Sequence, residues 1–77
     1  MTNTFINIYY VAEVYSGGGE TEYSEAFLTK EEAERLLYKK VVECSIENGE
    51  SIKLEYDYLY TVGMYSFWIE SKCLPIK

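Results

Sequence analysis

The chain has 77 residues, a formal net charge of −6 and no histidine. This length suffices for one small domain over residues 1–77, and a hydrophobic content of 48% argues against intrinsic disorder. The negative charge disfavours direct binding to nucleic acid or to an anionic membrane surface, but it suits a basic protein partner. The simpler alternative is that the charge only keeps a small protein soluble.

The first predicted element is a strand from Phe5 to Tyr15. Both of its alternating faces carry apolar residues, which is typical of a strand that is covered on both sides. We expect the face without a charged residue to meet the helix. That face contains Ile6, Ile8, Tyr10, Ala12 and Val14.

A hairpin turn is predicted at Gly17–Gly19, because glycine accepts positive φ values. No Lys-Ser/Thr pair follows these glycines, which argues against a phosphate-binding loop. The second predicted strand, Glu20–Leu28, has imperfect alternation and several glutamates. Both features indicate an edge strand.

The stretch from Thr29 to Gly49 predicts the main helix, running from about Lys30 to Glu47. Thr29 and Glu32 have the spacing of a capping box, and Gly49 suits the left-handed residue that ends a helix. One apolar stripe should lie on a sheet, with Lys40 reaching water or an acid. The stripe consists of Ala33, Leu36, Leu37, Val41 and Cys44.

Val42 and Ile46 fall on the opposite side of this helix, near Tyr38. We favour fraying or a bend after Lys40, which would turn Val42 and Ile46 inward. The alternative is a second apolar surface that a partner or a second subunit covers.

Two further strands complete the predicted fold. Ser51–Val62 alternates strictly, as in a half-buried antiparallel strand. Tyr65–Ser71 follows after a turn at Gly63, and Pro75 is expected to stop regular pairing. The order β-β-α-β-β predicts an α+β domain, in which an antiparallel sheet of about four strands carries one helix on one face.

Catalytic chemistry is not indicated by the sequence. There is no histidine for acid–base work at neutral pH, and Cys44 has no imidazole partner. Cys44 and Cys73, without histidine, do not make a zinc site, so we expect no metal, no cofactor and no enzyme activity. The chain shows no signal peptide and no run of about 20 apolar residues. We therefore expect a cytoplasmic protein with reduced cysteines.

Two groups of residues are candidates for binding a partner. Six glutamates lie between the predicted hairpin turn and the start of the helix, opposed only by Lys30 and Arg35. Such carboxylates can imitate phosphates in a basic groove, although a solvated face is the simpler explanation. Tyrosines on the sheet face away from the helix could supply contact area or pack as core. The candidates for partner contact are Glu20, Glu22, Glu25, Glu31, Glu34, Tyr9, Tyr15 and Tyr23.

The hairpin GGGETEYSEAF followed by the helix TKEEAERLL resembles, in size and in acidic, Tyr-rich composition, the small proteins of phages and mobile elements, including anti-CRISPR proteins. This resemblance implies stoichiometric inhibition of a host defence complex in the host cytoplasm, often by blocking its DNA-binding surface. It carries over no functional residues, because such proteins share no active site.

Three functions follow from these observations. The first is a protein-binding inhibitor of a basic nucleic-acid-binding complex. The second is a homodimeric structural or regulatory α+β domain, because Tyr9, Val11 and Tyr23 would form an apolar patch on an uncovered sheet face. The third is a small enzyme or ligand binder.

Overall fold

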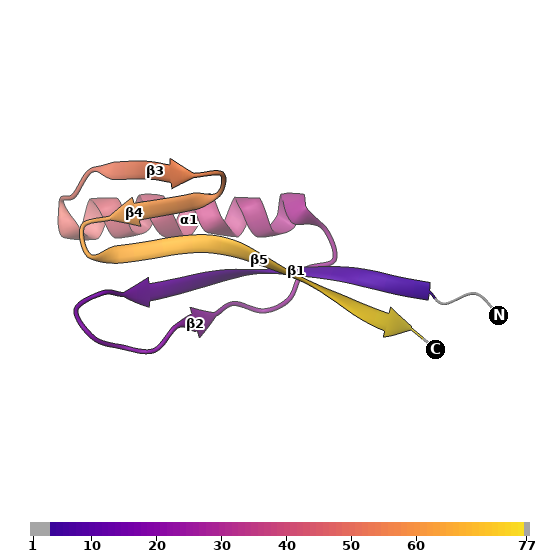
Figure 1. The fold of residues 1–77 in the computed structure, drawn as a ribbon. Helices are drawn as coiled ribbons and strands as arrows, with labels where there is room; N and C mark the ends of the chain where they lie inside the picture. Colours follow the sequence, from indigo (N-terminus) through magenta and orange to yellow (C-terminus); the bar gives the residue numbers. More distant parts are fainter. Residues whose placement is uncertain (1–3, 77) are drawn as a thin grey trace.

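The computed structural model describes residues 4–76 and shows one helix lying on one face of a five-stranded antiparallel sheet (Figure 1). The α+β class is confirmed. The strand order across the sheet is β2-β1-β5-β4-β3. The elements are β1 (Thr4–Tyr15), β2 (Glu22–Tyr23), α1 (Lys30–Asn48), β3 (Ile52–Tyr56), β4 (Leu59–Val62) and β5 (Tyr65–Ile76).

Both predicted ends of α1 are confirmed. The backbone N–H of Glu32 donates to Oγ1 of Thr29 at 3.3 Å, so the cap satisfies an amide that the helix start leaves unpaired. The Glu32 carboxylate accepts from the Thr29 hydroxyl at 2.8 Å, rather than from the cap's backbone. Gly49 ends the helix with φ 65°, in the left-handed region.

The core lies between α1 and the middle of the sheet. It contains residues from both ends of the chain, because β1 pairs with β5 along its whole length, from Thr4↔Ile76 to Tyr15↔Tyr65. The predicted helix stripe supplies one half of this core. The buried core cluster is Val11, Leu37, Val41, Val62 and Phe67.

The prediction for the two faces of β1 was wrong. Val11 is 1% exposed and packs with Leu37, so the face that was expected to turn away from the helix is the one that meets it. The charge of Glu13 had suggested the opposite. Its carboxylate is instead matched by Lys40 from the helix at 3.0 Å, and an opposed cation allows a carboxylate to face a helix.

The predicted strand Ser51–Val62 is in fact a hairpin of β3 and β4. Its turn is at Asp57 and Tyr58, where Tyr58 has φ 61°. The pairs Ile52↔Val62 and Leu54↔Tyr60 place even-numbered residues of both strands on the helix side. A register shift between Leu54↔Tyr60 and Tyr56↔Leu59 keeps the even-numbered residues in phase across the turn, so the period-2 pattern conceals the turn.

The second predicted strand, Glu20–Leu28, is much shorter than expected. Only Glu22 and Tyr23 form a regular strand, and Phe27 adds an isolated bridge to Tyr9. Between them Oγ of Ser24 accepts from the backbone N–H of Val11 at 2.9 Å. Side-chain bonding of this kind competes with a strand ladder, and so shortens β2.

Strand β5 runs on to Ile76, so Pro75 does not stop pairing as predicted. Tyr9 exchanges backbone hydrogen bonds with Phe27, so its N–H and C=O point away from β5. Ser71 lies opposite Tyr9, so its backbone N–H and C=O point away from β1. By alternation, the backbone nitrogen and C=O of Pro75 point the same way. The proline nitrogen therefore lies on an edge that needs no donor.

The same alternation identifies the unpaired groups of β3. The backbone N–H and C=O of Phe67 in β5 point toward Tyr60 of β4, so those of Tyr60 point toward β5. The N–H and C=O of the next residue, Thr61, therefore point toward Lys53 of β3. The N–H and C=O groups of Ile52 and Leu54 therefore face outward from the edge of the sheet.

The face of α1 opposite the buried stripe is exposed to solvent. The helix continues to Asn48 with no bend that buries Val42 or Ile46, which are 47% and 76% exposed. The favoured expectation of fraying was wrong. Val42 and Ile46 instead form a second apolar surface, as in the alternative given from the sequence.

Candidate functional site

An acidic surface lies on the flank of α1 that faces β1 and β2. Glu13 and Glu22 are direct partners across these strands, and like charges in such a pair destabilise a sheet. Lys40 reaches Glu13 from the helix, with side chains 32% and 28% exposed. One lysine therefore partly offsets a carboxylate pair that opposes folding.

Two hollows extend this surface on either side of Glu13. The first, about 360 Å³, is bounded by Glu20 and Glu22, and the second, about 210 Å³, by Glu43 and Glu47. Tyr65 lines both. We call this surface the acidic flank; it comprises Glu13, Glu20, Glu22, Glu43, Glu47, Tyr15 and Tyr65.

Tyr15 and Tyr65 of the acidic flank pack against each other. The rings of Tyr15 and Tyr65 are 4.9 Å apart between centroids, at an angle of 46°. Gly17 lies against the Tyr15 ring, where a Cβ would collide with it. The first glycine of the predicted turn therefore allows the close approach of this ring.

The predicted glutamates do not all gather on this surface. Glu20 and Glu22 lie on the acidic flank. Glu31 is in the first helical turn, about 14 Å along the axis from Lys40. Glu34 is on the other flank of α1, and Glu25 is exposed in the segment after β2.

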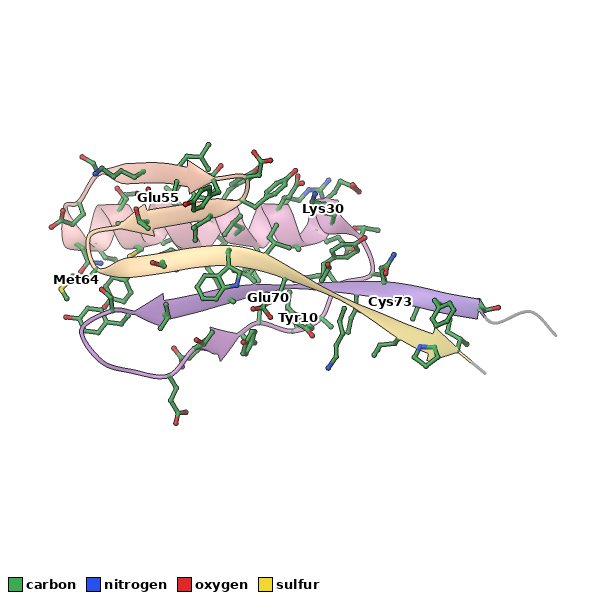
Figure 2. The ribbon with its side chains drawn as sticks, viewed as in Figure 1. Tyr10, Lys30, Glu55, Met64, Glu70 and Cys73 are labelled. Carbon is green, nitrogen blue, oxygen red and sulfur yellow. The ribbon has the colours of Figure 1, made fainter. Side chains whose placement is uncertain are left out.

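Glu34 belongs to a small cluster at the β3–β4 turn. Hydrogen bonding to its carboxylate raises the pKa of the Tyr58 phenol. The Nζ of Lys30 lies 4.2 Å from the centroid of the Tyr58 ring, a cation–π contact at the helix start (Figure 2). These contacts join the β3–β4 turn to the first part of α1.

The predicted tyrosines also separate. Tyr15 is on the acidic flank, Tyr9 is half-buried on the helix side, and only Tyr23 lies on the sheet face away from the helix. The patch expected from Tyr9, Val11 and Tyr23 does not exist, because Val11 is in the core. Tyr10 stands beside Tyr23 instead, with their rings edge to face at 5.8 Å.

Nothing in residues 4–76 indicates a metal centre, since no three of their cysteines, aspartates and glutamates are arranged to hold an ion. Cys73 is exposed, and burial raises the pKa of the Cys44 thiol. Over the same residues, no helix is long and apolar enough to cross a membrane.

Sequence reasoning missed Glu13, Glu43, Glu47 and Tyr65. The glutamates at 43 and 47 are one helical turn apart and follow Lys40 at spacings of three and seven. That spacing places all three on one helical flank. Their closeness to Glu22 depends on β1 facing the helix with Glu13, which the sequence pattern did not predict.

No family model matches the sequence, and neither a curated protein nor a solved structure is significantly similar to the chain.

Proposed function

We propose that the protein is a non-enzymatic inhibitor of the anti-CRISPR type, which binds a basic nucleic-acid-binding complex and blocks it through the acidic flank. The observation that supports this proposal is the like-charged pair of Glu13 and Glu22, which Lys40 only partly offsets, beside the rings of Tyr15 and Tyr65. A carboxylate pair that reduces stability is well suited to a basic partner, which would relieve the repulsion.

The two kinds of side chain have different tasks in this proposal. The carboxylates steer the encounter and fix the register, because exposed charges give little affinity at physiological salt. Tyr15 and Tyr65 supply rigid contact area in the centre of the surface. Replacing either ring should increase the dissociation rate, whereas replacing the carboxylates should reduce the association rate.

The test begins with phage plating on bacterial strains that each carry one active CRISPR system. We expect the expressed protein to restore plating on at least one strain. The corresponding purified complex should then lose DNA binding in a gel-shift assay as the protein is added. If plating is restored on no strain, the proposed inhibition is wrong. If the protein inhibits without reducing DNA binding, the proposed imitation of nucleic acid by the acidic flank is wrong.

A matched pair of variants locates the surface. The flank variant changes Glu20, Glu43 and Glu47 to lysine, and the control variant changes Glu25, Glu31 and Glu50 to lysine. Both alter the net charge equally at exposed positions. We expect only the flank variant to lose inhibition; equal behaviour of the two would show that the acidic flank is not the binding surface.

A further inference from the structure

The opposite flank of α1 carries an apolar surface that nothing in residues 4–76 covers. The rings of Tyr38 and Tyr60 meet edge to face at 5.9 Å, so this flank is turned toward the β3–β4 hairpin. The exposed fractions are between 42% and 76%. We call this the α1–β3 surface; its members are Tyr38, Val42, Ile46, Ile52 and Leu54.

A free backbone edge lies beside these side chains. Strand β3 is the last in the sheet, and the N–H and C=O groups of Ile52 and Leu54 point outward from it. Exposed edges of this kind pair readily with another strand. Apolar side chains and unpaired main-chain groups therefore coincide at one edge.

The sequence of β3 is complementary to itself. It reads IKLEY, with Leu54 at its centre, Lys53 before it and Glu55 after it. When two copies pair antiparallel about Leu54, Lys53 of each lies opposite Glu55 of the other, and Glu55 is at the register shift between Leu54 and Tyr56. Lys53 makes no ion pair in the described part of the chain, and Glu55 projects from β3, accepting only from Thr61 at 3.3 Å (Figure 2).

We propose that the protein forms a two-fold homodimer in which the β3 strands of two copies pair antiparallel about Leu54. The two Leu54 residues exchange N–H···O=C bonds, because their backbone groups face outward. The sheets join into one of ten strands, with both helices on the same face and their Tyr38 flanks turned toward each other. Such pairing covers Ile52 and Leu54 from both copies.

The dimer is independent of the proposed inhibition. The acidic flank adjoins β2 and β1, whereas the dimer edge is β3, at the other end of the strand order. Loss of either property therefore leaves the other measurable.

Charge reversal tests the register directly. Sedimentation equilibrium should show a dimer for the parent chain. Lys53→Glu places two glutamate pairs across the axis, and Glu55→Lys places two lysine pairs, so each variant should dimerise at least about tenfold more weakly. Circular dichroism should be unchanged, because both side chains are exposed.

Rescue distinguishes this register from other contacts. An equimolar mixture of the two variants should form a heterodimer, and the double variant Lys53→Glu/Glu55→Lys should regain self-association. Lys72→Glu, on β5, changes the net charge as Lys53→Glu does and should dimerise like the parent. A monomeric parent, weakening by Lys72→Glu equal to that by Lys53→Glu, or absence of rescue would overturn the proposal.

Discussion

The two flanks of α1 differ in charge and in what they leave unpaired. Toward β1 and β2 the helix presents Lys40 to a pair of opposed glutamates, and toward β3 it presents apolar side chains beside an open backbone edge. Both flanks rest on the same buried stripe. One helix thus gives a small domain two surfaces of unlike chemistry.

The largest expected effect is on the core that both flanks share. Leu37→Ala should lower the free energy of unfolding by about 3 kcal/mol, because Leu37 is fully buried and its loss leaves a cavity. Ile46→Ala, at a position 76% exposed on the same helix, should change it by less than about 0.5 kcal/mol. Urea denaturation measures both, and similar losses would contradict the assignment of inner and outer faces.

The next effect concerns the helix start, on which both flanks depend. Thr29→Ala should cost about 1 kcal/mol, because it removes the acceptor for the Glu32 amide. Thr29→Ser keeps that acceptor and should be nearly neutral. Thermal unfolding followed by circular dichroism compares the two, and an equal loss in both variants would argue against capping.

A smaller effect should separate the flanks. Lys40→Met leaves the Glu13–Glu22 pair unopposed and should cost about 0.5–1 kcal/mol at low salt. Adding Glu22→Gln should recover part of the loss, and 0.5 M salt should reduce it by screening at about 4–5 Å. If Lys40→Met lowers the free energy of unfolding equally with and without Glu22→Gln, repulsion between Glu13 and Glu22 is not the cause of the loss.

The smallest predicted effect, a difference in reactivity, compares the two thiols. Burial raises the pKa of Cys44, so at pH 8 less of it is thiolate than of an unperturbed cysteine, and its access is restricted. Exposed Cys73 should therefore be alkylated by iodoacetamide faster than Cys44. Mass spectrometry after timed quenching measures this, and the order should reverse only if the helix opens.

The helix was the most predictable part of the fold. Its cap, its end at Gly49 and its buried stripe all follow from local spacing, so no knowledge of distant residues was needed. The strand Glu20–Leu28 was less predictable, because Oγ of Ser24 accepts from the Val11 N–H in place of a backbone carbonyl, while the Ser24 N–H still donates to the Val11 carbonyl. Propensity along the chain does not report such a bond.

Two of the errors in the sheet, the faces of β1 and the pairing of Pro75, have one physical origin, which is that register and edge position are non-local. The faces of β1 depend on whether Glu13 finds Lys40, 27 residues away. The tolerance of Pro75 depends on which side of β5 remains open. The same holds for the acidic flank. Glu20 and Glu22 could be proposed from sequence, whereas Glu43 and Glu47 are placed on this flank only by the packing of α1 against β1.

The pairing of β1 with β5 also governs the order in which the molecule assembles. Thr4 lies opposite Ile76 and Tyr15 opposite Tyr65, so every rung of the central ladder closes a loop of about 50 residues or more. The helix and the β3–β4 hairpin need only local closure and can form first, while the high contact order of the central pair slows the completion of the sheet. During synthesis, β1 therefore has no central neighbour until β5 emerges, and its apolar residues are exposed to other chains for that interval.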